Sequence, residues 1–85
     1  MKNTWILGIR INDRVKEVYK VQETLSKFGC SIRTRLGLHS PEDQICSGCG
    51  LILLELIGDQ NECMKLENEL LKIDGLEVRK MIFSE

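Results

Sequence analysis

The stretch "LILLELI" at residues 51–57 decides the fold, because it is apolar at six of its seven positions. Successive side chains of a β-strand point to opposite faces of the sheet, so a strand of this composition would bury both of its faces. The stretch "TWILGIRI" at residues 4–11 is a similar short apolar run rich in isoleucine. We therefore expect these two segments to be the central strands of one sheet.

Two further segments have the spacing of amphipathic helices. The first apolar stripe comprises Val15, Val18, Gln22, Leu25 and Phe28, and the second comprises Cys63, Leu66, Leu70 and Ile73. Repeats of three and four residues place such side chains on one face of a helix. Asn12 or Asp13 is a suitable N-cap for the first helix, and Asp59 followed by Glu62 resembles a capping box for the second.

Gly29 and Gly75 are expected to end these helices, because glycine is favoured just beyond a helix C-terminus. The stretch "CSIRTRLGLH" (30–39) follows the first helix, and "LEVRKMIF" (76–83) follows the second. Both read as strands, and the first of them alternates in polarity. The resulting order β-α-β-β-α-β predicts an α+β, ferredoxin-like sandwich, with a four-stranded antiparallel-type mixed sheet and two helices on one face.

The alternation of side chains assigns residues to the two faces of this sheet. The helix-covered face should carry Trp5, Leu7, Ile9, Ile11, Ile32, Leu36, Leu38, Ile52, Leu54, Leu56, Val78 and Ile82, and the other face Ile6, Leu51, Leu53, Ile57, Met81 and Phe83. The second set would form an apolar patch of several hundred Å², more than monomers usually expose. We expect a homo-oligomer, a dimer or a tetramer, through this face or the sheet edges. The alternative is that long charged side chains at the rim cover it.

Charged residues on the uncovered face suggest an anion site. If the two central strands were parallel, Arg10 would lie beside Glu55, with Arg33, Arg35 and Arg79 on the flanking strands. Four arginines around one carboxylate leave positive charge unpaired, and the guanidinium fork matches a carboxylate or phosphate. A small anionic ligand is therefore one hypothesis. An interfacial ion network or a solvated edge is the other.

The four cysteines fall into two groups. Cys30 and Cys63 are expected in or near the core, where a free cysteine behaves as a small hydrophobe. Cys46 and Cys49 form a C-x-x-C pair in the polar connection from Ser40 to Gly50, shortly after His39. These three can converge on zinc, nickel or iron, with water, a nearby carboxylate or a neighbouring subunit completing the site. Packing within the loop is the alternative, and a thiol redox role is less favoured because a strand, not a helix, follows the pair.

The composition narrows the class of protein. Eighty-five residues suit one small domain, residues 1–85. A net charge of −1 and an aromatic content of 5% argue against direct binding of nucleic acid. No targeting segment is visible and no apolar run reaches about 18 residues, so we expect a cytoplasmic chain with reduced thiols and no membrane contact. Known catalytic motifs are absent, which favours a protein that is not an enzyme.

Three stretches give the chain a family resemblance: "ILGIRINDR", "RLGLHSPEDQICSGCGLILLELIGD" and "KIDGLEVRKMIF". With them it resembles the ACT-like ferredoxin-fold regulatory domains and, more narrowly, the iron-only hydrogenase system regulators. Relatives of this shape are similar to the regulatory domain of the nickel-responsive repressor and form dimers or tetramers. The resemblance implies an oligomeric regulator that senses a small molecule or a metal.

The resemblance also extends the predicted ligand site and shows one departure from the family. Ligand-binding ACT domains have an Asp-Arg-Pro-Gly-like turn after the first strand, and here Asp13 and Arg14 fit while Val15 and Lys16 do not. The full set of predicted ligand residues is Arg10, Asn12, Asp13, Arg14, Arg33, Arg35 and Glu55. We expect a non-enzymatic regulatory or ligand-binding module, with a metal-binding protein as the first alternative and a thiol redox protein as the second.

Overall fold

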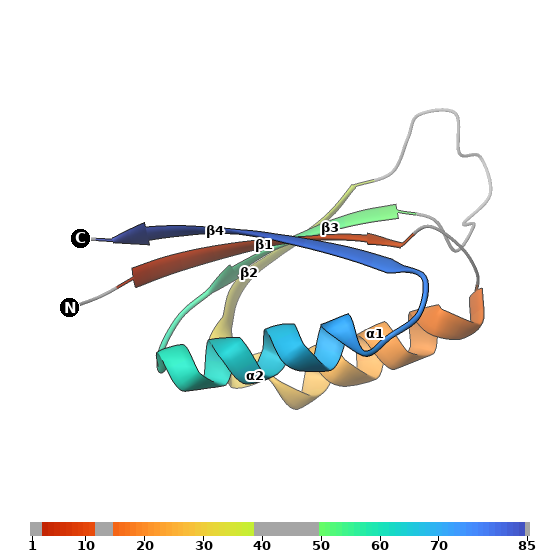
Figure 1. The fold of residues 1–85 in the computed structure, drawn as a ribbon, viewed down its shortest axis with the longest axis horizontal. Helices are drawn as coiled ribbons and strands as arrows, with labels where there is room; N and C mark the ends of the chain where they lie inside the picture. Colours follow the sequence, from red (N-terminus) through yellow and green to blue (C-terminus); the bar gives the residue numbers. More distant parts are fainter. Residues whose placement is uncertain (1–2, 12–14, 39–49, 85) are drawn as a thin grey trace.

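The computed structural model describes residues 3–11, 15–38 and 50–84. Its elements are β1 (Asn3–Ile11), α1 (Val15–Lys27), a 3-10 turn (Gly29–Ser31), β2 (Ile32–Leu38), β3 (Gly50–Leu56), α2 (Gln60–Leu71) and β4 (Leu76–Ser84). Figure 1 shows the two helices side by side on one side of the sheet. The predicted element order and the ferredoxin-like α+β class are confirmed.

The strands lie in the order β2-β3-β1-β4, so the two apolar strands are central as predicted. Every pairing is antiparallel, including that of β1 with β3. The parallel pairing assumed for the anion site is therefore wrong. The physical reason is that the two β-α-β halves interleave. β1 runs parallel to β2 with β3 between them, and β3 runs parallel to β4 with β1 between them, so direct neighbours run in opposite directions.

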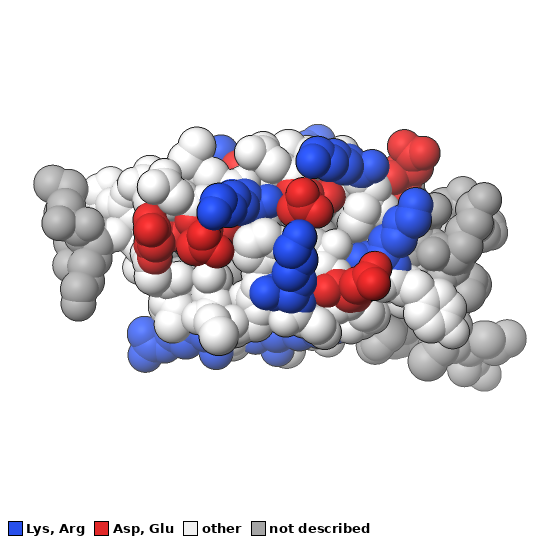
Figure 2. All heavy atoms as spheres, turned by 90° about the horizontal axis from the view of Figure 1, so that it is seen from below, with Lys and Arg blue, Asp and Glu red and all other residues white. Residues whose placement is uncertain are grey.

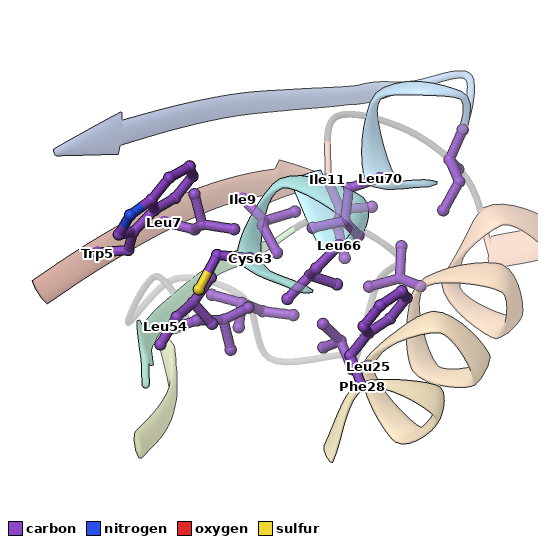
Figure 3. Packing of buried hydrophobic residues seen from close by; sticks show 14 residues of the cluster. Trp5, Leu7, Ile9, Ile11, Leu25, Phe28, Leu54, Cys63, Leu66 and Leu70 are labelled. Atoms are coloured by element: carbon purple, nitrogen blue, oxygen red, sulfur yellow. The ribbon is translucent and has the colours of Figure 1, made fainter. Parts of the chain in front are cut away.

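The core lies between the sheet and the helices (Figure 3). It consists of Trp5, Leu7, Ile9, Ile11, Val21, Leu25, Phe28, Ile52, Leu54, Leu56, Cys63, Leu66, Leu70 and Ile73. The predicted helix-covered residues of β1 and β3 are all in it. In α1, however, Val21 is buried and Gln22 is exposed, so the buried stripe runs through Val21 and not Gln22. The side chain of Val15 lies outside the described residues.

The ends of α2 follow the prediction in part. Asp59 is the N-cap, and its Oδ1 accepts a hydrogen bond from the backbone N–H of Asn61 at 2.9 Å. Among the described atoms the reciprocal bond of a capping box is not formed, because the Glu62 carboxylate pairs with Lys65 Nζ at 3.0 Å. Gly75 has a positive φ of 86°, which suits glycine at the turn into β4. Gly29 has no positive φ. At this residue the chain leaves α1 and enters the 3-10 turn.

A β-bulge in β2 changes which face of the sheet its residues lie on, relative to the prediction. A β-bulge between Ile32 and Thr34 leaves Arg33 as the extra residue opposite β3. Beyond it Thr34 and Leu36 share a face with Glu55 and Leu53, while Arg35 shares the helix-covered face with Leu54. The prediction for Leu36 is therefore wrong, since its side chain is 50% exposed on the face away from the helices. The side chain of Leu38 lies outside the described residues.

Candidate functional site

The predicted ligand residues do not form one cluster. Arg10 lies opposite Leu51 of β3 and Glu77 of β4, whereas Glu55 lies opposite Ile6 and Thr34. Because strand residues rise by about 3.3 Å, the four-residue offset from Leu51 to Glu55 separates Arg10 from Glu55 by roughly 13 Å along the sheet. The Glu55 carboxylate accepts a hydrogen bond from the Thr34 hydroxyl at 3.0 Å, which replaces the expected arginine contact.

Arg35 is also in a different place from the one predicted. The bulge turns it to the helix-covered side, where its Nη2 donates a hydrogen bond to Oε1 of Gln22 in α1 at 2.6 Å. This contact ties the edge strand β2 to the exposed margin of α1. Arg35 therefore lies on the opposite side of the sheet from Arg10, and the two cannot hold one ligand.

The remaining predicted site residues lie outside the described residues. They are Asn12, Asp13, Arg14, His39, Cys46 and Cys49. Within the described ranges, histidine, cysteine and acidic side chains form no group of three that could hold a metal ion. The zinc, nickel or iron site at the C-x-x-C pair thus stays a prediction.

The sheet surface away from the helices, which we call the open face, is the first candidate site. Its described residues are Thr4, Ile6, Gly8 and Arg10 of β1, Thr34 and Leu36 of β2, Leu51, Leu53 and Glu55 of β3, and Glu77, Arg79, Met81 and Phe83 of β4. Met81 and Phe83 are each 56% exposed, and Leu36 and Leu51 are also exposed. With Ile6 of β1, which is partly exposed, they form a band of apolar side chains that includes all four strands.

The charges on the open face balance one another. Arg79 Nη2 pairs with the Glu77 carboxylate at 2.7 Å, and Arg79 Nη1 also donates to the backbone carbonyl of Val78 at 3.1 Å. Arg10 occupies the register position beside Glu77. With Glu55, the described part of the face carries two positive and two negative side chains, so its net charge is zero.

The helix side of the molecule has a different surface. Figure 2 shows basic and acidic side chains interspersed over it. They include the pair Lys65–Glu62 on α2, at 3.0 Å, and the pair Lys72–Glu69 at the C-terminal end of α2, at 3.4 Å. Ion pairs three residues apart are typical of a helix surface in contact with water. This side carries more charged side chains than the open face, although Tyr19, Met64 and Leu71 are also exposed on it.

A cavity of about 560 Å³ is the second candidate site, at the end of the sheet where β1 and α2 begin and β3 ends. The side chains that give it chemical character are Asn3, Trp5, Arg33, Glu55, Gln60 and Cys63. Of the seven predicted ligand residues, Arg33 and Glu55 are brought together here. The other eight lining residues were not predicted as ligands. The sequence contained one signal for this cavity, the tryptophan at position 5 in an otherwise aliphatic strand. A buried indole N–H usually has a hydrogen-bond partner, so Trp5 indicated a polar group nearby.

The described cysteines differ in environment. Cys63 is buried as predicted, and burial raises the pKa of its thiol, with the nearby Asp59 carboxylate acting in the same direction. The cavity wall is therefore neutral at this position near pH 7. Cys30 is exposed, so its predicted place in the core is wrong. It lies in the 3-10 turn, before β2 enters the sheet.

Comparison with solved structures supports the fold assignment. The chain is similar to the uncharacterised protein TM1266 from Thermotoga maritima, with a TM-score of 0.83 and 28% identity over 99% of this chain and 100% of that one. It is also similar to the ACT domain of a GTP pyrophosphokinase from Chlorobium tepidum, with a TM-score of 0.69 and 18% identity over 95% of this chain and 100% of that domain. The fold is thus the ACT-like form of the ferredoxin-like sandwich.

Further comparisons support the fold but identify no family for the chain. A prephenate dehydratase from Streptococcus mutans matches with a TM-score of 0.61 and 15% identity, over 94% of this chain and 42% of that one. No family model matches the chain, and no curated protein matches it. The narrower resemblance to hydrogenase system regulators stays a prediction. Neither of the two described helices is long and apolar enough to cross a membrane.

Proposed function

We propose that this protein is a non-enzymatic regulatory module of ACT type that assembles with copies of itself through the open face. The apolar band on that face is the observation that carries the proposal. Monomeric proteins rarely leave a contiguous apolar patch of several hundred Å² in water. The ACT-like fold and the absence of known catalytic motifs from the sequence support a regulatory role.

The size of the open face suits a dimer interface. Four strands about 4.8 Å apart, each at least seven residues long with a rise of about 3.3 Å, give a flat footprint of roughly 450 Å². Side-chain relief raises the accessible area above this footprint. A standard interface buries about 800 Å² per partner, so one open face packed on another approaches that class.

The charges favour a second copy as the occupant. A two-fold dimer brings the same surface of each chain together, so an unbalanced charge on that surface would repel itself. The described part of the open face has no net charge, and its Glu77–Arg79 pair is already formed within one chain. Its four charged side chains therefore cause no net charge repulsion between two copies.

Gly8 marks the position where the open faces of two copies would approach each other most closely. It lies in the central strand β1, between Leu53 of β3 and Arg79 of β4. A Cβ atom built there meets Leu53 Cδ2 at 3.7 Å, an ordinary contact, so the fold of one chain tolerates a side chain at this position. Glycine inside a strand often marks a close approach by another backbone or ligand. We assign that role to the partner sheet.

Analytical ultracentrifugation of matched variants tests the proposal. Met81→Glu should weaken self-association by at least about 100-fold, because burying an unpaired charge costs several kcal/mol. Leu71→Glu is the control, since Leu71 is 58% exposed on α2 and Met81 is 56% exposed on the open face. A wild-type chain that is monomeric at micromolar concentration overturns the proposal, as does equal weakening by both variants.

A second variant distinguishes assembly from folding. Gly8→Val should leave the thermal stability of the dissociated chain equal or higher, because valine suits a strand. It should nonetheless weaken self-association, since the new methyl groups project from the open face. A Gly8→Val chain that assembles as the wild type does would remove Gly8 from the interface.

A further inference from the structure

The open face carries two charged side chains that no other described residue neutralises. Glu77 pairs with Arg79 at 2.7 Å within one chain. Arg10 forms no ion pair with another described residue, and the Glu55 carboxylate accepts only the hydrogen bond from the Thr34 hydroxyl, at 3.0 Å. Both lie in the central strands, so a second sheet on this face would cover them. A covered charge without a partner of opposite sign is strongly destabilising, so a partner sheet has to neutralise both.

The two residues cannot neutralise each other within one chain. Arg10 lies opposite Leu51 and Glu55 lies opposite Ile6, which separates the two by roughly 13 Å along the sheet. In a two-fold dimer, however, every contact between the copies occurs twice with the roles exchanged. A contact between Arg10 of one copy and Glu55 of the partner subunit is therefore repeated, and both charges of both copies are paired.

Glu77 is the other carboxylate on the described part of the open face, and it suits Arg10 less well. Its charge is already balanced by Arg79. Arg10 and Glu77 are in register on β1 and β4, so a dimer that paired them would have its axis between these two strands. Such a dimer leaves Glu55 without a partner. It also leaves the exposed Leu36 of β2 beyond the edge of the partner sheet.

A two-fold dimer that pairs Arg10 with Glu55 is centred on Gly8. Arg10 lies two residues beyond Gly8 in β1, and Glu55 lies two residues beyond Leu53 in β3. Because Gly8 and Leu53 are in register on antiparallel strands, the midpoint between the two charges falls between them. The axis thus passes where one strand has no side chain, so the two backbones can approach there. The glycine and the charges are independent features, and both indicate the same centre.

The same arrangement has a crossing angle close to that of packed β-sheets. Neighbouring strands are about 4.8 Å apart, so the line from Arg10 to Glu55 is inclined by roughly 20° to the strands. A two-fold axis perpendicular to this line makes the strands of the two copies cross at twice that angle, roughly 40°. Aligned sheets pack face to face at about 30°. The charges alone therefore select an orientation in which two sheets can pack.

We propose that two copies pack open face on open face with Arg10 of each chain paired with Glu55 of the partner subunit. The arrangement rests on the proposed function and adds to it the orientation of the two copies and the contact by which one copy recognises another. Glu55 also lines the cavity at the end of the sheet. Arg10 of the partner subunit therefore lies at the margin of that cavity in the dimer.

Analytical ultracentrifugation of two charge-reversed variants, alone and mixed, tests the pairing. Arg10→Glu and Glu55→Arg should each weaken self-association at least about tenfold, because both symmetric contacts become like-charged. In the mixed dimer of the two variants, both contacts join opposite charges again. An equimolar mixture should therefore associate within about threefold of the wild-type affinity.

A mixture of Arg10→Glu with Glu77→Arg is the control. Its two chains carry the same net charges as those of the first mixture, but positions 10 and 77 do not face each other in the proposed dimer. It should stay at least about tenfold weaker than the wild type. Circular dichroism checks that every variant folds. Equal recovery in both mixtures would mean that only net charge matters, which overturns the proposal, as does wild-type association of either variant alone.

The outcome also separates this pairing from the proposed function. If the wild type assembles and Met81→Glu does not, but the mixture of Arg10→Glu with Glu55→Arg fails to recover, the open face remains the interface and the pairing is wrong. If the wild type is monomeric at micromolar concentration, the proposed function and the pairing are both wrong.

Discussion

The two faces of the sheet come from the same strands but have different environments. Leu7 and Ile9 point to the helices and are fully buried, whereas Ile6 and Met81, on the opposite face, are partly or largely exposed. The sequence alternation separates these sets without any difference in how apolar they are. Strand alternation therefore assigns a residue to a face, and the covering layer decides whether that residue stabilises the single chain or its assembly.

The largest expected difference is in the free energy of unfolding. Leu7→Ala should lower it by about 3 kcal/mol, because the variant loses a fully buried side chain and leaves a cavity in the core. Met81→Ala should lower it by less than about 1 kcal/mol, because that side chain is mostly exposed in one chain. Urea unfolding at concentrations where the chain is dissociated measures both. Equal losses would contradict the separation of the two faces.

A smaller effect is expected at alkaline pH. Burial raises the pKa of the Cys63 thiol in the folded state, so above the unfolded pKa of about 8.5 the unfolded chain binds fewer protons than the folded one. The contribution of Cys63 to the free energy of unfolding is therefore fully present below about pH 8.5. It decreases as the pH rises toward the folded pKa, with a slope that approaches about 1.4 kcal/mol per pH unit.

Urea unfolding of the wild type and of Cys63→Ala at pH 8 and pH 10 isolates this contribution. The wild type should lose more stability between the two pH values than the variant does. Cys30→Ala is the control, because Cys30 is exposed, and it should follow the wild type. An identical pH dependence for the wild type and Cys63→Ala would show that the buried thiol does not titrate as described.

The smallest expected effect distinguishes two arginines that the sequence had grouped together. Arg10→Ala should weaken self-association several-fold, since Arg10 lies on the open face beside Glu77. Arg35→Ala should leave self-association unchanged and lower the free energy of unfolding by about 0.5–1.5 kcal/mol through loss of the Gln22 bond. Sedimentation and urea unfolding measure the two effects. If Arg35→Ala weakened self-association and Arg10→Ala did not, the assignment of Arg35 to the helix-covered face would be wrong.

The sequence was sufficient for the elements, the central strands and the faces of β1 and β3. Their alternation is regular, and each helix carries an apolar stripe of the right spacing. It was insufficient for β2, because "CSIRTRLGLH" alternates without any sign of an extra residue at Arg33. A bulge arises from the pairing of β2 with β3, and the alternation of polarity within one strand does not predict that pairing.

The candidate sites differ in the same way. In β1, β3 and β4 the open face follows from alternation, and the described residues Ile6, Leu51, Leu53, Met81 and Phe83 were placed correctly. The cavity depends on where β1 and α2 begin and β3 ends in space, so only Arg33 and Glu55 of its lining were predicted as ligand residues. That Trp5 Nε1 and Asn3 Oδ1 have no partner among the described residues is a property of three-dimensional packing.

The interleaved strand order has a consequence for how the chain folds. β1 forms its sheet contacts with β3 and β4, and the pair Asn3–Ser84 joins residues from the two ends of the sequence. Neither half can complete its own sheet, because each half's two strands are separated by a strand of the other. Closing such long loops carries an entropic cost before the contacts form. The domain should therefore fold as one cooperative unit, and separate halves should gain structure only when mixed.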